Sequence, residues 1–217
     1  MALGVFGEVY LRGEVIVRGD ATQTAVNIVA SARLYRLSFV TDLMTYACVI
    51  TMVWTLYVVL KPVNRNVVLL AVFLRLVENS ILAVITLCGF AELALLSGAD
   101  YLRVFDAKQL QALAYTLYRV HGAGFNIGFV FLGLGSAVFS YVWLKSRYIP
   151  RSLAAWGIFS SLVLTVVTLV VMVFPTLGAT LGLTYMLPMG IYEVGLGLWL
   201  LVKGIQAPIP QVDSTMS

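Results

Sequence analysis

Five apolar segments, each long enough to cross a lipid bilayer, constrain this chain more than any other feature. They lie at about residues 38–60, 67–96, 118–144, 152–174 and 183–202. A membrane-spanning helix needs about 20 mostly apolar residues, and none of the segments alternates with the period of two that is typical of a barrel strand. We therefore predict an all-α membrane protein, built as a single bundle of five transmembrane helices.

Composition agrees with a membrane bundle and excludes several other classes. The chain is 61% hydrophobic and only 11% charged, whereas about 25% of the residues of a soluble domain are charged. No basic run favours a nucleic-acid partner. The two cysteines, Cys48 and Cys88, lie inside apolar segments, so they form neither a disulfide framework nor a paired metal-ligand motif.

The ends of the apolar region divide the chain into three parts. Residues 1–37 are predicted to be an extracytoplasmic segment with a surface helix, for which Asp20 would be the N-cap. Residues 38–204 form the bundle, and residues 205–217 form a flexible cytoplasmic tail.

Residues 1–10 resemble the end of an apolar segment whose beginning is missing. We therefore expect one further helix upstream, which would make six helices in the full pattern. The polar stretch 100–111 is expected to lie along the outer surface.

Cations beside the apolar segments set the expected orientation. Six lie in short loops on one side, with only Asp213 against them: Lys61, Arg65, Lys145, Arg147, Arg151 and Lys203. The cations of the other side are mixed with acidic residues. Because cytoplasmic loops carry an excess of Lys and Arg, we predict a multi-pass protein of the inner (plasma) membrane with a cytoplasmic C-terminus.

Four stretches, in this order along the chain, resemble a bacterial membrane family. They are residues 12–21 (RGEVIVRGDA), 74–78 (LRLVE), 119–128 (RVHGAGFNIG) and 145–150 (KSRYIP). The family is catalogued as the domain of unknown function numbered four thousand three hundred and eighty-six. The resemblance implies a polytopic membrane protein with an additional N-terminal helix, and it implies no activity. We predict no catalytic residue, no metal and no cofactor. A zinc site of three histidines cannot form in a chain that has one histidine.

Polar residues inside the apolar segments are the candidates for binding a substrate or a proton. A charge at mid-membrane costs at least ~2.5–3.5 kcal/mol on insertion scales, so such residues are rare without a reason. The candidates are Glu193, Arg75, Glu78, His121, Asp42 and Asn79. Glu92 is interpreted as interfacial and is left out.

Arg75, Glu78 and Asn79 share one face of their helix, so the arginine and the glutamate can pair within it. The pair either locks the interior of the bundle or binds a substrate or proton in a hydrated cavity.

Glu193 is the foremost candidate, because it lies near the middle of its segment with no cation nearby. It either pairs with Arg75 across the bundle or stays protonated, since an apolar environment disfavours a charged carboxylate. Gly190 and Gly197 share its helix face and would let a neighbouring helix approach closely.

His121 shares a helix face with Gly124, Gly128 and Gly135, which indicates close packing against another helix. The histidine either makes a hydrogen bond between helices or relays protons. Asp42 is expected at a similar depth, in the outer third of the bundle.

Three function classes follow from these residues. The first is a small-solute or proton-coupled transporter with a polar cluster at mid-membrane. The alternative is a structural or regulatory membrane subunit without transport, and the least favoured is an intramembrane enzyme that uses Asp42 and His121 on a lipid-like substrate. Expected partners are membrane lipids and a second copy of the chain, packed through the glycine-rich helix faces.

Overall fold

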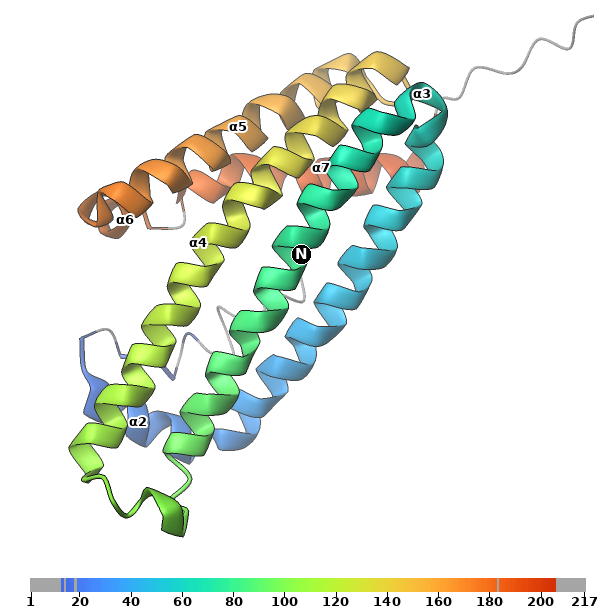
Figure 1. Cartoon of the computed structure of the whole chain (residues 1–217). Coiled ribbons are helices and arrows are strands. Elements are labelled where there is room, and N and C mark those ends of the chain that lie inside the picture. The colour runs from blue at the N-terminus through green and yellow to red at the C-terminus, as the bar shows by residue number, and fades with distance from the viewer. Residues whose placement is uncertain (1–12, 14, 18, 183, 206–217) are drawn as a thin grey trace, which may run out of the picture. The chain divides into compact units, whose positions relative to one another are not determined.

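The computed structural model describes residues 13, 15–17, 19–182 and 184–205, and in this part of the chain the regular structure is helical throughout. The helices are α2 (Ala21–Ala30), α3 (Ala32–Leu95), α4 (Ala107–Ser146), α5 (Arg151–Val173), α6 (Pro175–Leu181) and α7 (Leu187–Val202), with short 3-10 turns at Asp100–Leu102 and Thr184–Met186 (Figure 1). Within the described residues, four helical segments are long and apolar enough to cross a membrane: Ala32–Leu95, Ala107–Ser146, Arg151–Val173 and Thr184–Val202. The predicted all-α membrane bundle is confirmed.

Two compact units share the long helices. Unit 1 comprises Met1–Thr55 and Arg75–Phe131, and unit 2 comprises Leu56–Leu74 and Leu132–Ser217. Each unit therefore takes one stretch of α4 and parts of α3.

Helix α3 contains the first two predicted spans, joined at Asn64. The backbone of Asn64 is not helical (φ −162°, ψ 98°), and Pro62 lies two residues before it. Proline removes a backbone donor and crowds the preceding turn, which ends the first arm of α3. The side chain of Asn64 then accepts a hydrogen bond from the Val67 amide (3.1 Å), so it caps the second arm.

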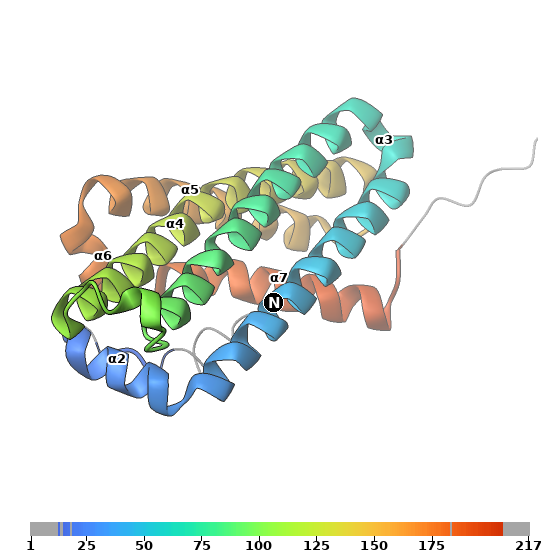
Figure 2. The same cartoon turned by 60° about the horizontal axis from the view of Figure 1, so that its bottom comes forward.

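In unit 1 the two arms of α3 run antiparallel. The Tyr46 hydroxyl lies 3.1 Å from the Thr86 hydroxyl, and the rings of Phe39 and Phe90 are 4.3 Å apart between centroids. These contacts are roughly symmetric about Asn64, as a helical hairpin requires, and Figure 2 shows the arms side by side.

Helix α4 packs on the second arm through its glycines. Gly124 lies against Ile85 and Gly128 against Leu82, and a Cβ atom on Gly124 would stand only 2.3 Å from a methyl carbon of Ile85. The expected glycine-lined contact of α4 is present at these two positions.

Helix α2 begins as the sequence predicts. The Asp20 side chain accepts a hydrogen bond from the Gln23 amide (2.8 Å) and caps the helix. Two hydrogen bonds join this region to α4, from the Gly19 amide to the Tyr115 hydroxyl (2.8 Å) and from Thr22 to Gln111 (3.0 Å).

The stretch 100–111, which we expected along the outer surface, is divided between two elements, the 3-10 turn Asp100–Leu102 and the first turn of α4. Helix α4 starts at Ala107, because Asp106 accepts a hydrogen bond from the Gln109 amide (2.8 Å) and caps the polar first turn.

Unit 2 is held together by small side chains and hydroxyl groups. Ser140 of α4 donates to the hydroxyl of Tyr192 on α7 (2.8 Å), and Gly157 of α5 lies against both residues. The hydroxyl of Ser161 is 3.6 Å from the sulfur of Met189. Small residues let helices approach closely where lipid offers no hydrophobic gain from association.

The packing of Gly133 generates a stability prediction for α4. A Cβ atom there would stand 2.8 Å from the backbone oxygen of Ser161, whereas one at Gly122 would meet nothing within 4 Å. Gly133→Ala should therefore lower the free energy of unfolding by about 1–3 kcal/mol through overpacking. Gly122→Ala is the control on the same helix and should be neutral or stabilising. Thermal unfolding in detergent measures both, and equal Tm values for the two variants would contradict the packing of α4 on α5.

Candidate functional site

A column of buried polar side chains runs between the two arms of α3 and helix α4 in unit 1, and we call it the polar column. Its members are Tyr35, Ser38, Asp42, Tyr46, Arg75, Glu78, Asn79, Thr86, Glu92 and His121, all of them buried. From Arg75 to Glu92 a helix rises about 25 Å at 1.5 Å per residue. The column therefore extends over most of the ~30 Å thickness of a bilayer core.

At one end of the column, Arg75 and Glu78 form an ion pair. Their Nη1 and Oε2 atoms are 3.0 Å apart, and each side chain is 5% exposed. This is the pairing within one helix that the spacing predicts. Asn79 donates a long hydrogen bond to the Tyr46 carbonyl (3.4 Å) and so links this end to the first arm of α3.

At the other end, Glu92 accepts a hydrogen bond from the Tyr35 hydroxyl. Glu92 is 1% exposed, so it is a buried member of the polar column, although the sequence analysis left it out of the candidates. Val15, Ile28 and Phe39 pack with Tyr35 into one apolar cluster beside it. The sequence contains one signal for the burial of Glu92. Glu78, Ile85 and Glu92 follow one another at intervals of seven residues, which places them on one helix face.

Asp42 and His121 lie between the two ends. The contacts of Tyr46 with Thr86 and of Gly124 with Ile85 fix the register of the three helical segments. Asp42 is one turn from Tyr46, and His121 is one turn from Gly124, both in the direction of Glu92. Both side chains are 3% exposed and neither lacks a partner. The His121 ring also packs edge-on against Phe125, with 5.0 Å between centroids.

Glu193 does not belong to the polar column. It lies on α7 in unit 2, where its side chain is partly exposed. Arg75 was one expected partner of Glu193, but the ion pair found for Arg75 among the described residues is with Glu78. Five of the six candidates, Arg75, Glu78, Asn79, Asp42 and His121, thus come together in unit 1, and the sixth belongs to unit 2.

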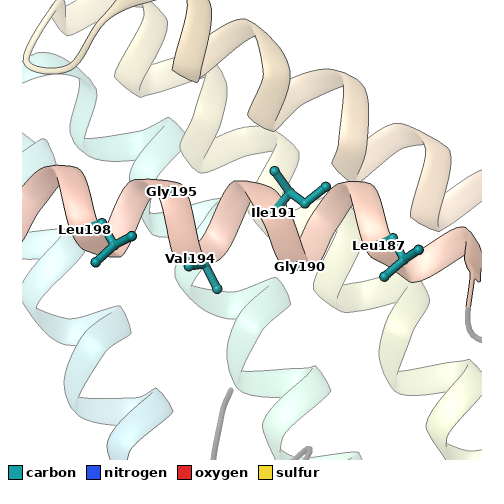
Figure 3. A pocket seen from close by; sticks show the side chains of 6 residues that line it. All are labelled: Leu187, Gly190, Ile191, Val194, Gly195 and Leu198. Carbon is teal, nitrogen blue, oxygen red and sulfur yellow. The ribbon is translucent and has the colours of Figure 1, made fainter.

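The glycine-rich face of α7 is also different from the expectation. Among the described residues, no atom lies within 4 Å of a Cβ built on Gly190 or Gly197. Instead, a shallow apolar groove of about 500 Å³ follows this helix (Figure 3), lined by Leu187, Gly190, Ile191, Val194, Gly195 and Leu198. The internal close packing that we expected through Gly190 and Gly197 is therefore not found in the described part of the chain.

Among the described residues, the ionisable groups of the polar column are the carboxylates of Asp42, Glu78 and Glu92, the guanidinium group of Arg75 and the imidazole of His121. Within the described residues, no three His, Cys, Asp or Glu side chains come together as a metal site would require. The chemistry that these groups offer is the binding and exchange of protons or small cations by carboxylates and a histidine.

Long apolar helices around a buried ionisable column define an integral membrane protein of the helical-bundle class. Comparison with known families then identifies the chain: residues 1–204 match the model of the domain of unknown function DUF4386, so the chain belongs to that family. The resemblance that the four sequence stretches indicated is confirmed. Neither the curated proteins nor the solved structures include a match to the chain.

The ion pair of Arg75 and Glu78 generates the second prediction. Glu78→Leu should lower the free energy of unfolding by about 3–5 kcal/mol, because it leaves a buried guanidinium group without its counter-charge. The double variant Arg75→Met with Glu78→Leu should regain much of that loss, since an apolar pair of similar volume needs no desolvated charge. Chemical unfolding in detergent measures both. A double variant as unstable as the sum of the two single variants would show that the pair is not coupled in this way.

Proposed function

We propose that this DUF4386 protein is a multi-pass transporter of the plasma membrane that moves a small solute together with protons, and that the polar column of unit 1 is its pathway. The observation that carries the proposal is the burial of five charged or titratable residues between the helices of unit 1: Asp42, Arg75, Glu78, Glu92 and His121. Ionisable residues inside membrane spans most often mark an ion, proton or substrate path.

Packing alone does not require such groups, and unit 2 is the comparison within the same chain. The described helices of unit 2 associate through glycine, hydroxyl groups and a methionine sulfur. Each charged side chain placed at mid-membrane costs at least ~2.5–3.5 kcal/mol on insertion scales. Unit 1 buries five such groups, whereas the contacts just described between the helices of unit 2 are made by neutral groups. This difference favours a role for the ionisable groups beyond holding helices together.

The side chains of the column support protons as the coupled ion. Asp42, Glu78, Glu92 and His121 are all buried in it, and carboxylates and imidazoles are the groups that bind and release protons in membrane proteins. Between Glu78 and the level of Asp42, the hydroxyl groups of Thr86 and Tyr46 lie 3.1 Å apart and can take part in a hydrogen-bonded relay.

A structural or regulatory subunit is the second candidate. It is favoured by the ion pair of Arg75 with Glu78 and by the hydrogen bond from Tyr35 to Glu92, because both satisfy a charged group inside the protein. Buried pairs of this kind specify helix register in some systems.

Proton flux distinguishes the two candidates. In liposomes that contain the purified protein and a pH-sensitive dye, the native chain should dissipate a pH gradient faster than empty liposomes. Asp42→Asn and His121→Gln should each slow the flux by about tenfold or more, since positioned proton-transfer groups contribute factors of about 10²–10⁴.

Asp100→Asn is the matched control, because the Asp100 side chain is 87% exposed and lies outside the polar column. It should leave the flux unchanged. If the native protein produces no flux with any solute tested, while Asp42→Asn lowers Tm, the structural subunit is the better description.

The cations at the helix ends support the orientation that we propose, with the end of α4 and the C-terminus in the cytoplasm. In a variant with Cys48 and Cys88 replaced by serine, Ser97→Cys should react with a membrane-impermeant maleimide on intact cells. Ser146→Cys should react only after the cells are permeabilised. The reverse pattern would show that the topology is the opposite of the one that we propose. Labelling of both cysteines in intact cells would show that residues 97 and 146 lie on the same side of the membrane.

A further inference from the structure

Unit 2 carries a strongly basic surface that the transport proposal does not use. Its described residues include six cations and a single carboxylate, Glu193. All six cations are exposed: Lys61, Arg65, Lys145, Arg147, Arg151 and Lys203. Glu193 is about 15 Å along α7 from Lys203, at 1.5 Å per residue, so no carboxylate of the described unit lies among them.

The packing of unit 2 gathers these cations at one end. Helix α4 ends at Ser146 and α5 begins at Arg151, so the three cations of this connection lie together. Gly157 contacts Tyr192 and Gly195 contacts Leu153, which makes α7 antiparallel to α5. The C-terminal end of α7, with Lys203, therefore lies beside the N-terminal end of α5. The turn of α3, with Lys61 and Arg65, is at this end of unit 2 in both views (Figures 1 and 2).

Arg147 has a backbone conformation that favours glycine. Its φ is +58°, the one positive φ of a non-glycine residue in the described chain. The Arg147 amide donates to the Trp143 carbonyl (3.2 Å) and closes the last turn of α4, a position that glycine or asparagine usually occupies. An arginine at this position strains the backbone and also places a cation there. A ligand for the cation would account for the strained conformation.

Aromatic or apolar side chains lie beside three of the cations. The ammonium group of Lys145 lies 5.1 Å from the Tyr141 ring, and that of Lys61 lies 5.9 Å from the Tyr57 ring. Leu201 and Val202, next to Lys203, are 84% and 75% exposed. Such a boundary between apolar surface and cations matches a molecule with an anionic head and apolar tails.

We propose that this end of unit 2, the basic end, binds the headgroups of anionic phospholipids. The arginine and lysine side chains donate charge-assisted hydrogen bonds to the phosphate oxygens, and the exposed leucine and valine contact the acyl chains. Clusters of four to eight Lys and Arg residues beside membrane helices are typical of such recognition. The exposed apolar contacts favour a lipid over a free phosphate ion. This inference is independent of the transport proposal.

Thermal unfolding of the full chain, purified and delipidated in detergent, tests the proposal. Dioctanoyl phosphatidylglycerol should raise Tm in a concentration-dependent way, since a ligand of the folded state stabilises it. Dioctanoyl phosphatidylcholine and inorganic phosphate at the same concentrations should not. A matching rise with phosphatidylcholine would indicate binding through the acyl chains alone, and a matching rise with phosphate would indicate a site for free anions; either would overturn the proposal.

Arg147→Gly is the decisive variant, because glycine fits the positive φ and the fold should be retained. Its Tm without lipid should equal or exceed that of the native chain, while its apparent affinity for phosphatidylglycerol should fall about fivefold, the factor expected for one cation near an anionic surface. Arg119→Gln removes an exposed cation from unit 1 and should leave the affinity unchanged. Lys145→Gln is a second test at the basic end. Undiminished affinity in both Arg147→Gly and Lys145→Gln would overturn the proposal.

Discussion

The fold of unit 1 depends on the need to satisfy ionisable groups away from water. Glu92 accepts a hydrogen bond from the Tyr35 hydroxyl, and Arg75 forms an ion pair with Glu78. Asn79 donates a hydrogen bond to the Tyr46 carbonyl. The first and last of these contacts join the two arms of α3. Because one residue of shift turns a helix face by about 100°, another register of the hairpin would separate these partners. The polar contacts thus specify the register that apolar packing between similar residues leaves open.

The two units solve the same packing problem with different chemistry. Unit 2 brings α4, α5 and α7 together through glycines and hydroxyl groups, as at Gly157, Ser140 and Tyr192. Unit 1 also uses glycines, at Gly124 and Gly128, but it adds ionisable groups along the same contact. The long helices α3 and α4 contribute to both units, so the difference lies in side chains and not in the type of fold.

Local features could be predicted from the sequence, and features set by tertiary register could not. The spans follow from segment length and hydropathy, the cap at Asp20 from its own neighbours, and the pair Arg75–Glu78 from a spacing of three on one helix. The burial of Glu92 could not be predicted, because it depends on Tyr35, which is 57 residues away. Glu193 looked like part of one cluster because nothing in its own helix indicates that α7 belongs to the second unit. The unexpected start of α4 has a local cause, the cap at Asp106, which the predicted span did not take into account.

The polar column differs from the rest of the described interior in the kind of group that it buries. Arg75 and Glu78 compensate each other as an ion pair, whereas Asp42, Glu92 and His121 are buried at other levels of the column. Apolar residues of similar volume often replace buried charged groups without loss of stability. Stability alone therefore does not explain why the column is built from ionisable side chains, and the binding and exchange of protons by these groups is the explanation that we propose.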